Sequence, residues 1–256
     1  MAKVFAITNQ KGGVGKTTTS VNLAASLAAT KRRVLMIDID PQGNATMGSG
    51  VDKYNCEQSV CDLLLGDATF SDVKVSTDPA GYDLLPANAE LTTAEVQLLQ
   101  QDKGQFSLKN ALSDVLDQYD YVLMDCPPSL NMLTVNALTA AQGVIIPVQC
   151  EYYALEGLAA LMSTVEQIKE TVNPDLEISG ILRTMYDPRN RLANDVSEQL
   201  KTHFGDKVYR TVIPRNVRLA EAPSYGLPVL HYEKQSRGAM AYLALAAEFI
   251  RKNKAK

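Results

Sequence analysis

The chain has 256 residues, of which 46% are hydrophobic and 21% charged, a composition typical of a globular protein that buries a full core. No apolar run approaches the roughly 20 residues that a membrane-spanning helix needs. The first strand-like segment starts so early that we expect no signal peptide. The four cysteines include no CxxC pair and no histidine at metal spacing, so reduced thiols in a cytosolic protein are expected.

The net charge of −4 is distributed unevenly along the sequence. Residues 1–182 contain 11 Lys and Arg against 22 Asp and Glu, whereas residues 183–256 contain 14 against 7. An anionic partner for the C-terminal third is one explanation of this positive excess, and a well-solvated basic surface is the other. Charge alone leaves the two explanations equally open.

Apolar runs of strand length alternate with segments of helix length along almost the whole chain. The strands are expected at residues 3–8, 33–38, 83–85, 121–125, 144–148, 178–184 and 208–213. They are rich in Val, Ile and Leu without strict polar alternation, as in strands covered on both faces. The helices are expected at residues 17–29, 59–65, 108–117, 131–141, 153–171, 194–203 and 239–251. This order predicts an α/β fold with a mostly parallel twisted sheet, covered by helices on both faces.

No feature of the sequence marks a domain boundary, because it contains neither an internal repeat nor a linker rich in Pro, Gly or Ser. A single domain over residues 1–256 is therefore expected. Residues 48–77 are the least patterned part of the chain. They are expected to form a loop-rich excursion around the short helix at residues 59–65.

A glycine-rich loop follows the first expected strand and leads directly into the first helix. Its residues are Lys11, Gly12, Gly13, Val14, Gly15, Lys16, Thr17 and Thr18. In this context successive backbone N–H groups converge on a phosphate at the positive end of the helix. We expect Lys16 to reach the β- and γ-phosphates, the Thr17 hydroxyl to ligate Mg²⁺, and Thr18 to contact the α-phosphate. The sequence therefore predicts a P-loop fold that binds a nucleoside triphosphate with Mg²⁺.

The loop departs from the standard GxxxxGK[ST] pattern in an informative way. Gln10 stands where the first glycine should be, and an additional lysine, Lys11, precedes the glycines. This arrangement is the deviant Walker A motif. The motif is typical of one branch of the P-loop proteins.

Carboxylates end two of the expected strands. Asp38 and Asp40 follow one apolar run, and Asp125 ends the run at residues 121–125. Ligands of parallel sheets lie at the carboxyl ends of strands, and buried carboxylates are costly unless they face a cation or a polar site. We assign Asp40 to orienting the attacking water and taking up its proton, and Asp125 to holding Mg²⁺ through a water. Asp38 either supports the loop or is a satisfied polar strand end, and residues 126–129 could act as a switch beside the γ-phosphate.

Residues 184–187 indicate which base the site accepts. They read Thr-Met-Tyr-Asp at the end of a late strand. P-loop GTPases usually have Asn/Thr-Lys-x-Asp at the comparable place. Methionine in place of that lysine favours adenine over guanine, so ATP is the expected nucleotide.

Four further segments, together with the loop, make the chain similar to the ParA/Soj family of deviant Walker A ATPases over nearly its whole length. They are residues 38–46 (DIDPQGNAT), 125–129 (DCPPS), 148–157 (VQCEYYALEG) and 212–224 (VIPRNVRLAEAPS). Members of this family move and partition DNA. No helix-turn-helix segment precedes the first expected strand, so the chain resembles the short, chromosomal type.

The resemblance implies slow hydrolysis of ATP to ADP and phosphate, with ATP and Mg²⁺ as cofactors. It also implies an ATP-sandwich homodimer, in which Lys11 crosses to the partner's phosphates like an arginine finger. Lys11 thereby joins Lys16 and Asp40 as a catalytic residue, and Glu151 is expected at the dimer interface. The residues expected around the adenine are Met185, Pro214 and Asn216.

The resemblance further implies binding to double-stranded DNA without sequence preference, through basic residues of the C-terminal half. Arg189 and Arg218 match the family's motif positions most closely. Weaker candidates are Arg191, Arg215, Lys234 and Arg237. For each of these residues a solvated surface position is an equally good explanation. Phosphate contacts would make binding sensitive to salt, and a ParB-type DNA-bound partner and a cytoplasmic, nucleoid-associated location are expected.

A MinD-like membrane ATPase is the nearest rival interpretation, because it shares the loop and both acidic strand ends. Such proteins end in a basic amphipathic helix that inserts into lipid. Here the helix at residues 239–251 has an apolar stripe typical of a core helix, and only a short polar tail at residues 252–256 follows it. The stripe consists of Ala239, Leu243, Ala246, Ala247 and Ile250. No membrane partner is therefore expected.

Two more classes of protein are compatible with the glycine-rich loop. An iron–sulfur reductase of the nitrogenase iron-protein type has the deviant loop and needs two cysteines per subunit at the dimer axis. Cys126 stands near a suitable place, whereas Cys56 and Cys61 lie far upstream. A small-molecule kinase or synthetase is compatible with the loop alone, although nothing in the sequence suggests a dedicated acceptor pocket.

Overall fold

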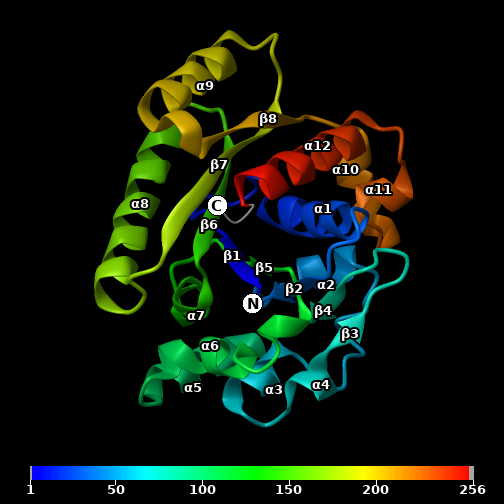
Figure 1. Ribbon diagram of the computed structural model, residues 1–256, viewed down its shortest axis with the longest axis vertical. Helices are drawn as coiled ribbons and strands as arrows, with labels where there is room; N and C mark the ends of the chain where they lie inside the picture. Colours follow the sequence, from blue (N-terminus) through cyan, green and yellow to red (C-terminus); the bar gives the residue numbers. More distant parts are fainter. Residues whose placement is uncertain (1, 254–256) are drawn as a thin grey trace.

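The computed structural model describes residues 2–253 (Figure 1). Within them, eight strands form one sheet in the order β3-β4-β2-β5-β1-β6-β7-β8. The strands are β1 (Lys3–Ile7), β2 (Val34–Asp38), β3 (Val75–Ser76), β4 (Asp83–Leu85), β5 (Tyr121–Asp125), β6 (Gly143–Gln149), β7 (Glu177–Tyr186) and β8 (Val208–Pro214). Neighbouring strands are parallel except for the short antiparallel pair β3 and β4. The mostly parallel sheet expected from the sequence is confirmed.

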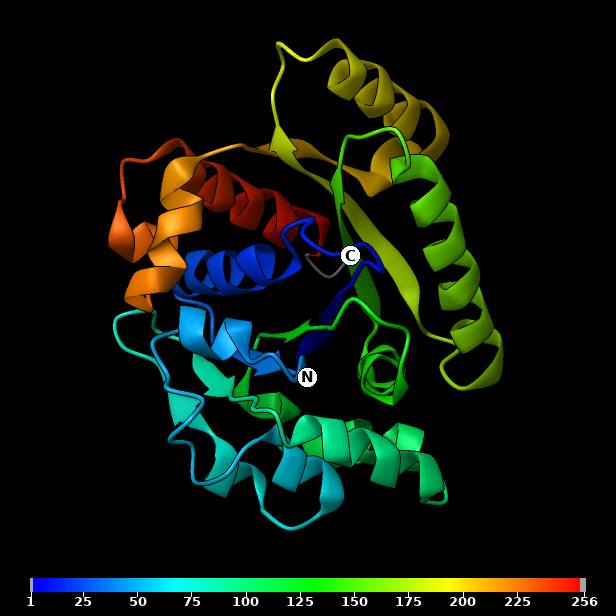
Figure 2. The ribbon, with the colours of Figure 1, turned by 180° about the vertical axis from the view of Figure 1, so that it is seen from behind.

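Helices cover both faces of the sheet, as Figures 1 and 2 show from opposite sides. They are α1 (Lys16–Ala28), α2 (Asn44–Gly48), α3 (Val60–Leu65), α4 (Phe70–Val73), α5 (Leu91–Gln100), α6 (Ser107–Leu112), α7 (Met132–Ala140), α8 (Ala154–Thr171), α9 (Arg191–Phe204), α10 (Val217–Glu221), α11 (Val229–Tyr232) and α12 (Arg237–Lys252). Helices α1 and α12 pack together on one face, whereas α7 and α8 lie on the other. The α/β fold predicted from the alternating pattern is therefore confirmed.

Strand β1 explains why the central strands are apolar on both sides. Successive side chains of a strand point to opposite faces of the sheet. Phe5 and Ile7 pack in the layer formed with α1 and α12, whereas Val4 and Ala6 pack in the layer formed with α7 and α8. All four side chains are buried. Polar alternation is absent because neither face of the strand meets water.

Two expected helix boundaries are wrong. Helix α9 begins at Arg191 rather than at residue 194, because the Asn190 side chain accepts a hydrogen bond from the backbone N–H of Ala193 and caps the helix there. The helix expected at residues 108–117 ends at Leu112 and is followed by a separate 3₁₀ turn, Leu116–Gln118.

Several elements lie where none was expected. Residues 48–77 contain α4 and β3 in addition to the expected short helix, and α5 lies between β4 and α6. Helix α4 begins with a capping box, in which the side chains of Thr69 and Asp72 bond to each other's backbone N–H groups. That pairing was the sequence signal for this helix.

The expected apolar stripe of α12 is partly wrong. Ala247 is exposed, and the side chains that face the core are those of Tyr242, Leu245 and Phe249, together with Ala239 and Ala246. The helix still packs as a core helix, against α1 and β8. No helix within residues 2–253 combines the length and the apolarity that crossing a membrane requires. Residues 254–256 of the expected polar tail lie outside the described part of the chain.

The sheet register aligns the carboxyl ends of β1, β2 and β5. Ile7 of β1 and Asp38 of β2 are both register partners of Asp125 in β5. The glycine-rich loop, the loop after β2 and the loop after β5 therefore leave the sheet side by side at its carboxyl edge.

Candidate active site

A cavity of about 530 Å³ lies at this carboxyl edge of the sheet. Its walls come from the glycine-rich loop, the first turn of α1, the loops after β2 and β5, the end of β7, the segment from β8 into α10, and α12. The site residues expected from the sequence that line it are Gly12, Gly13, Gly15, Lys16, Thr17, Thr18, Asp40, Met185, Pro214 and Asn216. Lys11, Val14, Asp125 and Glu151 do not line it.

The glycine-rich loop holds its lysine inward. Gly15 has a φ of 88°, in the left-handed region that favours glycine, and the helix begins at the next residue. The Lys16 side chain is 7% exposed, and its Nζ donates to the Lys11 carbonyl at 3.2 Å. Burial lowers the pKa of Lys16, while Asp125 and Asp40 act in the opposite direction. The loop thus keeps the Lys16 ammonium at the cavity wall, beside Asp40 on the same wall and the buried Asp125 behind it.

Asp125 is fully buried behind the first turn of α1. Its Oδ2 accepts a hydrogen bond from the Thr17 hydroxyl at 2.8 Å, and its Oδ1 accepts one from the Ser20 hydroxyl at 2.7 Å. Burial is the main cause that raises the pKa of Asp125, and the nearby Asp38 raises it further. A hydroxyl and a carboxylate in contact are ligands that Mg²⁺ accepts together with phosphate oxygens and water. The donor set therefore fits Mg²⁺.

Asp38 organises the loop after β2 instead of lining the cavity. Its Oδ2 accepts hydrogen bonds from the backbone N–H and the hydroxyl of Thr46, both at 2.8 Å, and its Oδ1 accepts one from the N–H of Asp40 at 3.2 Å. The Thr46 hydroxyl also accepts a bond from the Ala87 N–H at 2.9 Å. Burial raises the pKa of Asp38. These contacts support the interpretation of Asp38 as a support for the loop.

Asp40 lies on the cavity wall itself. Its side chain is 8% exposed, and its Oδ1 accepts a hydrogen bond from the Gln42 N–H at 2.9 Å. The same wall contains Lys16 and Thr17. A carboxylate that lines the cavity and is held by a single backbone N–H is placed to accept a proton from a water in the cavity.

Met185, Pro214 and Asn216, which the sequence predicts around the adenine, line the cavity together. Met185 has a φ of 47°, a conformation that a residue with a side chain adopts at a cost and that concentrates at functional sites. Asn216 lines the same cavity, and its buried Oδ1 has no hydrogen-bond partner within residues 2–253. A buried amide oxygen of this kind can accept a hydrogen bond from the 6-amino group of adenine.

Lys11 and Glu151 are brought together within one chain. Lys11 Nζ lies 2.6 Å from Glu151 Oε2, and both side chains are about half exposed. The backbone N–H of Lys11 donates to Asn9 Oδ1, and Asn9 Nδ2 donates to the Pro147 carbonyl of β6. Lys11 therefore points toward the end of β6 and away from its own cavity.

The two expected DNA-binding arginines are exposed, and each is paired with a neighbouring carboxylate. Arg189 makes two hydrogen bonds to Asp187, from Nε at 3.0 Å and from Nη2 at 2.8 Å. Arg218 Nη1 lies 2.7 Å from Glu221 Oε2. A DNA phosphate at either position would compete with the local carboxylate.

Some residues that shape the site were not singled out from the sequence. Thr184 ties the loop to β7, because its hydroxyl donates to the Val14 carbonyl at 2.7 Å. Ser20 bonds to Asp125, and its spacing of three residues from Thr17 on α1 was a usable signal. Tyr242 of α12 reaches the cavity wall from the end of the chain, and no local pattern could place it there.

Comparisons with known proteins agree with this arrangement. Residues 2–178 match the model of a family described as AAA domain. The chain is 55% identical to the sporulation initiation inhibitor protein Soj of Bacillus subtilis over 97% of this chain and 98% of that protein. It is 51% identical to the chromosome partitioning protein ParA of Caulobacter vibrioides over 97% of this chain and 94% of that one.

Solved structures share the fold, and one of them was solved with a bound nucleotide. The cobyrinic acid a,c-diamide synthase from Mycobacterium smegmatis, solved with bound ADP and magnesium, superposes with a TM-score of 0.86 at 39% identity. The match covers 98% of this chain and 95% of that one. The cell division ATPase MinD of Pyrococcus furiosus superposes with a TM-score of 0.79 at 25% identity, over 98% and 99% of the two chains. These likenesses extend over nearly the whole length.

Proposed function

The chain belongs to the ParA/Soj family of chromosome-partitioning ATPases, and we propose that ATP drives it into a sandwich homodimer that binds DNA without sequence preference. Hydrolysis of the bound ATP then releases the dimer from DNA. The observation that carries this proposal is the cavity in which Lys16, Thr17 and Asp40 meet at the carboxyl edge of the sheet. It offers a cation, a metal-binding hydroxyl and a base to a single phosphate chain.

Each group has one role in this proposal. Residues 12–18 cradle the phosphates with backbone N–H groups, and Lys16 stabilises charge on the β- and γ-phosphates. Thr17 would hold Mg²⁺ directly and Asp125 would hold it through a water. When bound, Mg²⁺ neutralises charge that develops on the phosphate oxygens. Asp40 orients the attacking water and takes its proton.

ATP is the proposed nucleotide because of the base end of the cavity. The unpartnered Asn216 Oδ1 accepts a hydrogen bond from the 6-amino group of adenine. Guanine has a carbonyl oxygen at that place and could not donate this bond. Met185 and Pro214 line the same end and enclose the ring. Gly238 lets α12 pack closely against two residues of this end, because a Cβ there would lie 2.6 Å from Leu219 Cγ and 3.2 Å from Asn216 Oδ1.

The dimer is proposed because the Lys11 side chain points away from its own cavity. Lys11 is the one lysine of the loop that lies outside its own cavity, and it is exposed on the surface beside Glu151. In the sandwich it crosses to the phosphates of the partner subunit, and Glu151 lies at the interface. An exposed ion pair is worth roughly 0–1 kcal/mol, so breaking the Lys11–Glu151 contact costs little.

Lys11→Ala is expected to bind ATP and to remain a monomer, whereas the wild type dimerises with ATP. The reason is that the variant keeps the cradle but loses the contact across the interface. Light scattering with and without ATP measures this difference. Glu151→Gln is the matched control, since it removes the same ion pair and keeps the lysine. It is expected to dimerise at most about fivefold more weakly. An ATP-dependent Lys11→Ala dimer as tight as wild type would rule out the role across the interface.

DNA binding is proposed to use Arg189 and Arg218 on the dimer. Both are exposed in segments that follow the carboxyl ends of β7 and β8, and dimerisation would double every phosphate contact. Arg191, Arg215, Lys234 and Arg237 remain weaker candidates. A ParB-type DNA-bound protein is proposed to stimulate hydrolysis, and the location is proposed to be cytoplasmic and nucleoid-associated. No membrane partner is proposed, because the apolar side of α12 packs against α1 and β8.

Arg218→Glu is expected to weaken DNA binding by at least about tenfold, because the dimer loses the contact twice and gains repulsion twice. ATP binding and dimerisation should be retained. Mobility shifts on unrelated duplexes measure the effect. Lys109→Glu is the matched control, since it makes the same charge change on an exposed residue of α6. Arg189→Glu should have a smaller effect. Wild-type DNA affinity in a dimeric Arg218→Glu would remove this surface from the mechanism.

A further inference from the structure

A second cavity, of about 500 Å³, lies beside strand β8, which is an edge strand of the described sheet. We call it the β8-edge cavity. Helices α9 and α12 end beside it, and it shares no lining residue with the nucleotide cavity. Its basic lining residues are Arg183, Lys201, Arg210, Arg251 and Lys252, and its acidic ones are Asp206 and Glu248. The lining therefore has an excess of positive charge.

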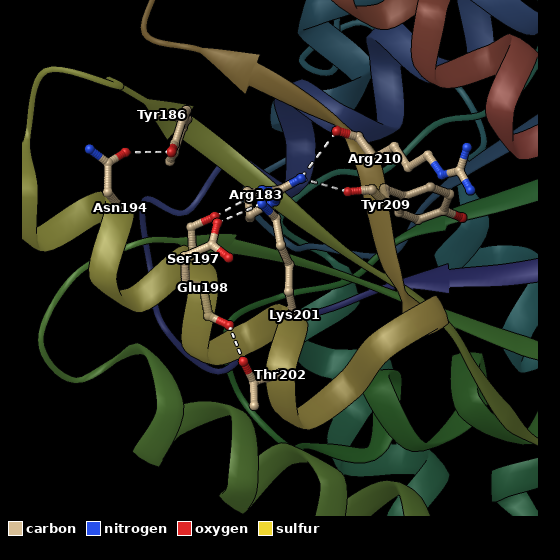
Figure 3. Close-up of polar contacts among 9 residues, drawn as sticks. All are labelled: Arg183, Tyr186, Asn194, Ser197, Glu198, Lys201, Thr202, Tyr209 and Arg210. Carbon is tan, nitrogen blue, oxygen red and sulfur yellow. Dashed lines mark hydrogen bonds and ion pairs between the residues drawn. The ribbon is translucent and has the colours of Figure 1, made fainter.

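Arg183 is the buried member of this lining. Its side chain is 4% exposed, and Figure 3 shows its guanidinium between α9 and β8. Nη1 donates to the Ser197 hydroxyl at 2.8 Å, and Nη2 donates to the carbonyls of Tyr209 and Arg210 at 2.8 and 3.1 Å. Its Nε has no partner, and no carboxylate in the described chain forms an ion pair with it. A buried charge without a counter-ion is costly.

Strand β8 supplies two of the three hydrogen-bond acceptors of Arg183, and Ser197 of α9 supplies the third, so the arginine is held without an ion pair. The register between β7 and β8 shifts here, because Ile181 pairs with Val208 whereas Arg183 pairs with Val212. Arg183 satisfies carbonyls of the bulged segment. Glu248 accepts hydrogen bonds from the backbone N–H groups of that segment, at 2.7 and 2.9 Å. The Glu248 carboxylate is thus committed to the backbone and does not neutralise Arg183.

Two of the other basic residues of the lining bond to neighbouring groups, and two form no ion pair within the described residues. Lys201 is paired with Glu198 at 2.7 Å, and Lys252 Nζ donates to the Asp206 carbonyl at 2.6 Å. Arg210 and Arg251 are exposed and take part in no ion pair among the described residues. The guanidinium groups of Arg210 and Arg251 are therefore available to an anion, and the buried charge of Arg183 belongs to the same lining.

We propose that the β8-edge cavity is a second binding site, which takes the phosphoryl group of a small anionic ligand through Arg183, Arg210 and Arg251. Guanidinium groups present several donors in one plane and match the oxygens of a phosphoryl group. A phosphoryl dianion would supply the counter-charge that Arg183 lacks. Inorganic phosphate and the phosphates of a nucleotide offer the same chemistry. The site is independent of the proposed partitioning cycle.

Calorimetric titration of inorganic phosphate tests this proposal on protein saturated with ADP and Mg²⁺, so that the glycine-rich loop is already filled. One saturable site per chain is expected. Binding should be about 100-fold weaker in the double variant Arg210→Gln, Arg251→Gln, because each of the two lost charge-assisted contacts costs about tenfold. Lys207→Gln is the matched control. It removes one exposed charge from the 3₁₀ turn Gly205–Lys207, whose first two residues line the cavity while Lys207 does not. It should bind phosphate as wild type does.

A second titration, of ADP into Lys16→Ala, distinguishes the sources of the phosphoryl group. Saturable ADP binding that the Arg210→Gln, Arg251→Gln pair abolishes would identify a nucleotide as the ligand. Wild-type protein that shows no saturable phosphate binding would overturn the proposal, and so would unchanged phosphate affinity in the double variant. ATP hydrolysis by the double variant should equal that of wild type. The proposed function is judged separately, by hydrolysis and DNA binding of the wild type.

Discussion

Replacing Asp40 with alanine is expected to leave ATP binding close to wild type and to lower the rate of hydrolysis by about 100-fold or more. Loss of a positioned general base typically costs roughly 10²–10⁴-fold. The phosphate cradle and the pair of Thr17 and Asp125 are separate from Asp40 and should be unaffected. Phosphate release measures the rate, and calorimetry with a non-hydrolysable ATP analogue measures the affinity.

Asp40→Asn is the matched variant, because its amide oxygen can still accept the bond that the Gln42 N–H donates to Asp40 at 2.9 Å. The loop keeps its geometry, but the side chain can no longer take a proton. Both variants should therefore be slow. Turnover at the wild-type rate by Asp40→Asn would show that Asp40 acts through loop geometry and not as a base.

Lys16→Ala is expected to weaken ATP binding by about 100-fold, because two charge-assisted phosphate contacts of roughly 1.5 kcal/mol each are lost. The stability of the folded protein should not decrease. Burial lowers the pKa of Lys16, which means that the folded protein holds this charge less well than the unfolded chain does. Its removal should leave the melting temperature of the nucleotide-free protein unchanged or higher.

Lys11→Ala is the control for this experiment, since it removes a lysine from the same loop but not from the cavity. It should retain wild-type affinity for ATP in the monomer. If Lys16→Ala bound ATP as tightly as Lys11→Ala does, Lys16 would not contact the phosphates.

The sequence predicts well which residues line the cavity, because the signals at this edge of the sheet are local. A glycine-rich loop between a strand and a helix indicates phosphate binding, and Asp38 and Asp125 are carboxylates that end apolar strands, with Asp40 two residues beyond the first of them. The register in which Asp38 pairs with Asp125 follows once the strands are parallel neighbours. Deviations in helix boundaries arise where a cap decides the start, as Asn190 does for α9.

Other features of the molecule depend on contacts between distant segments, which no local pattern contains. Thr46 links Asp38 to the N–H of Ala87, which is 41 residues further along the chain. The basic excess of residues 183–256 indicates a charged surface, yet it includes Arg183, whose guanidinium is buried between α9 and β8 (Figure 3). Charge counts along a sequence cannot distinguish a buried arginine from one on the surface.

In the proposed cycle ATP, and not ADP, makes this protein bind DNA irrespective of sequence. The direct test is the affinity of the wild type for two duplexes of unrelated sequence, measured with ATP, with ADP and without nucleotide over a series of salt concentrations. We predict binding with ATP alone, equal on both duplexes and weakening steeply as salt rises. Equal affinity in the three nucleotide states, or no binding to either duplex with ATP, would contradict the account.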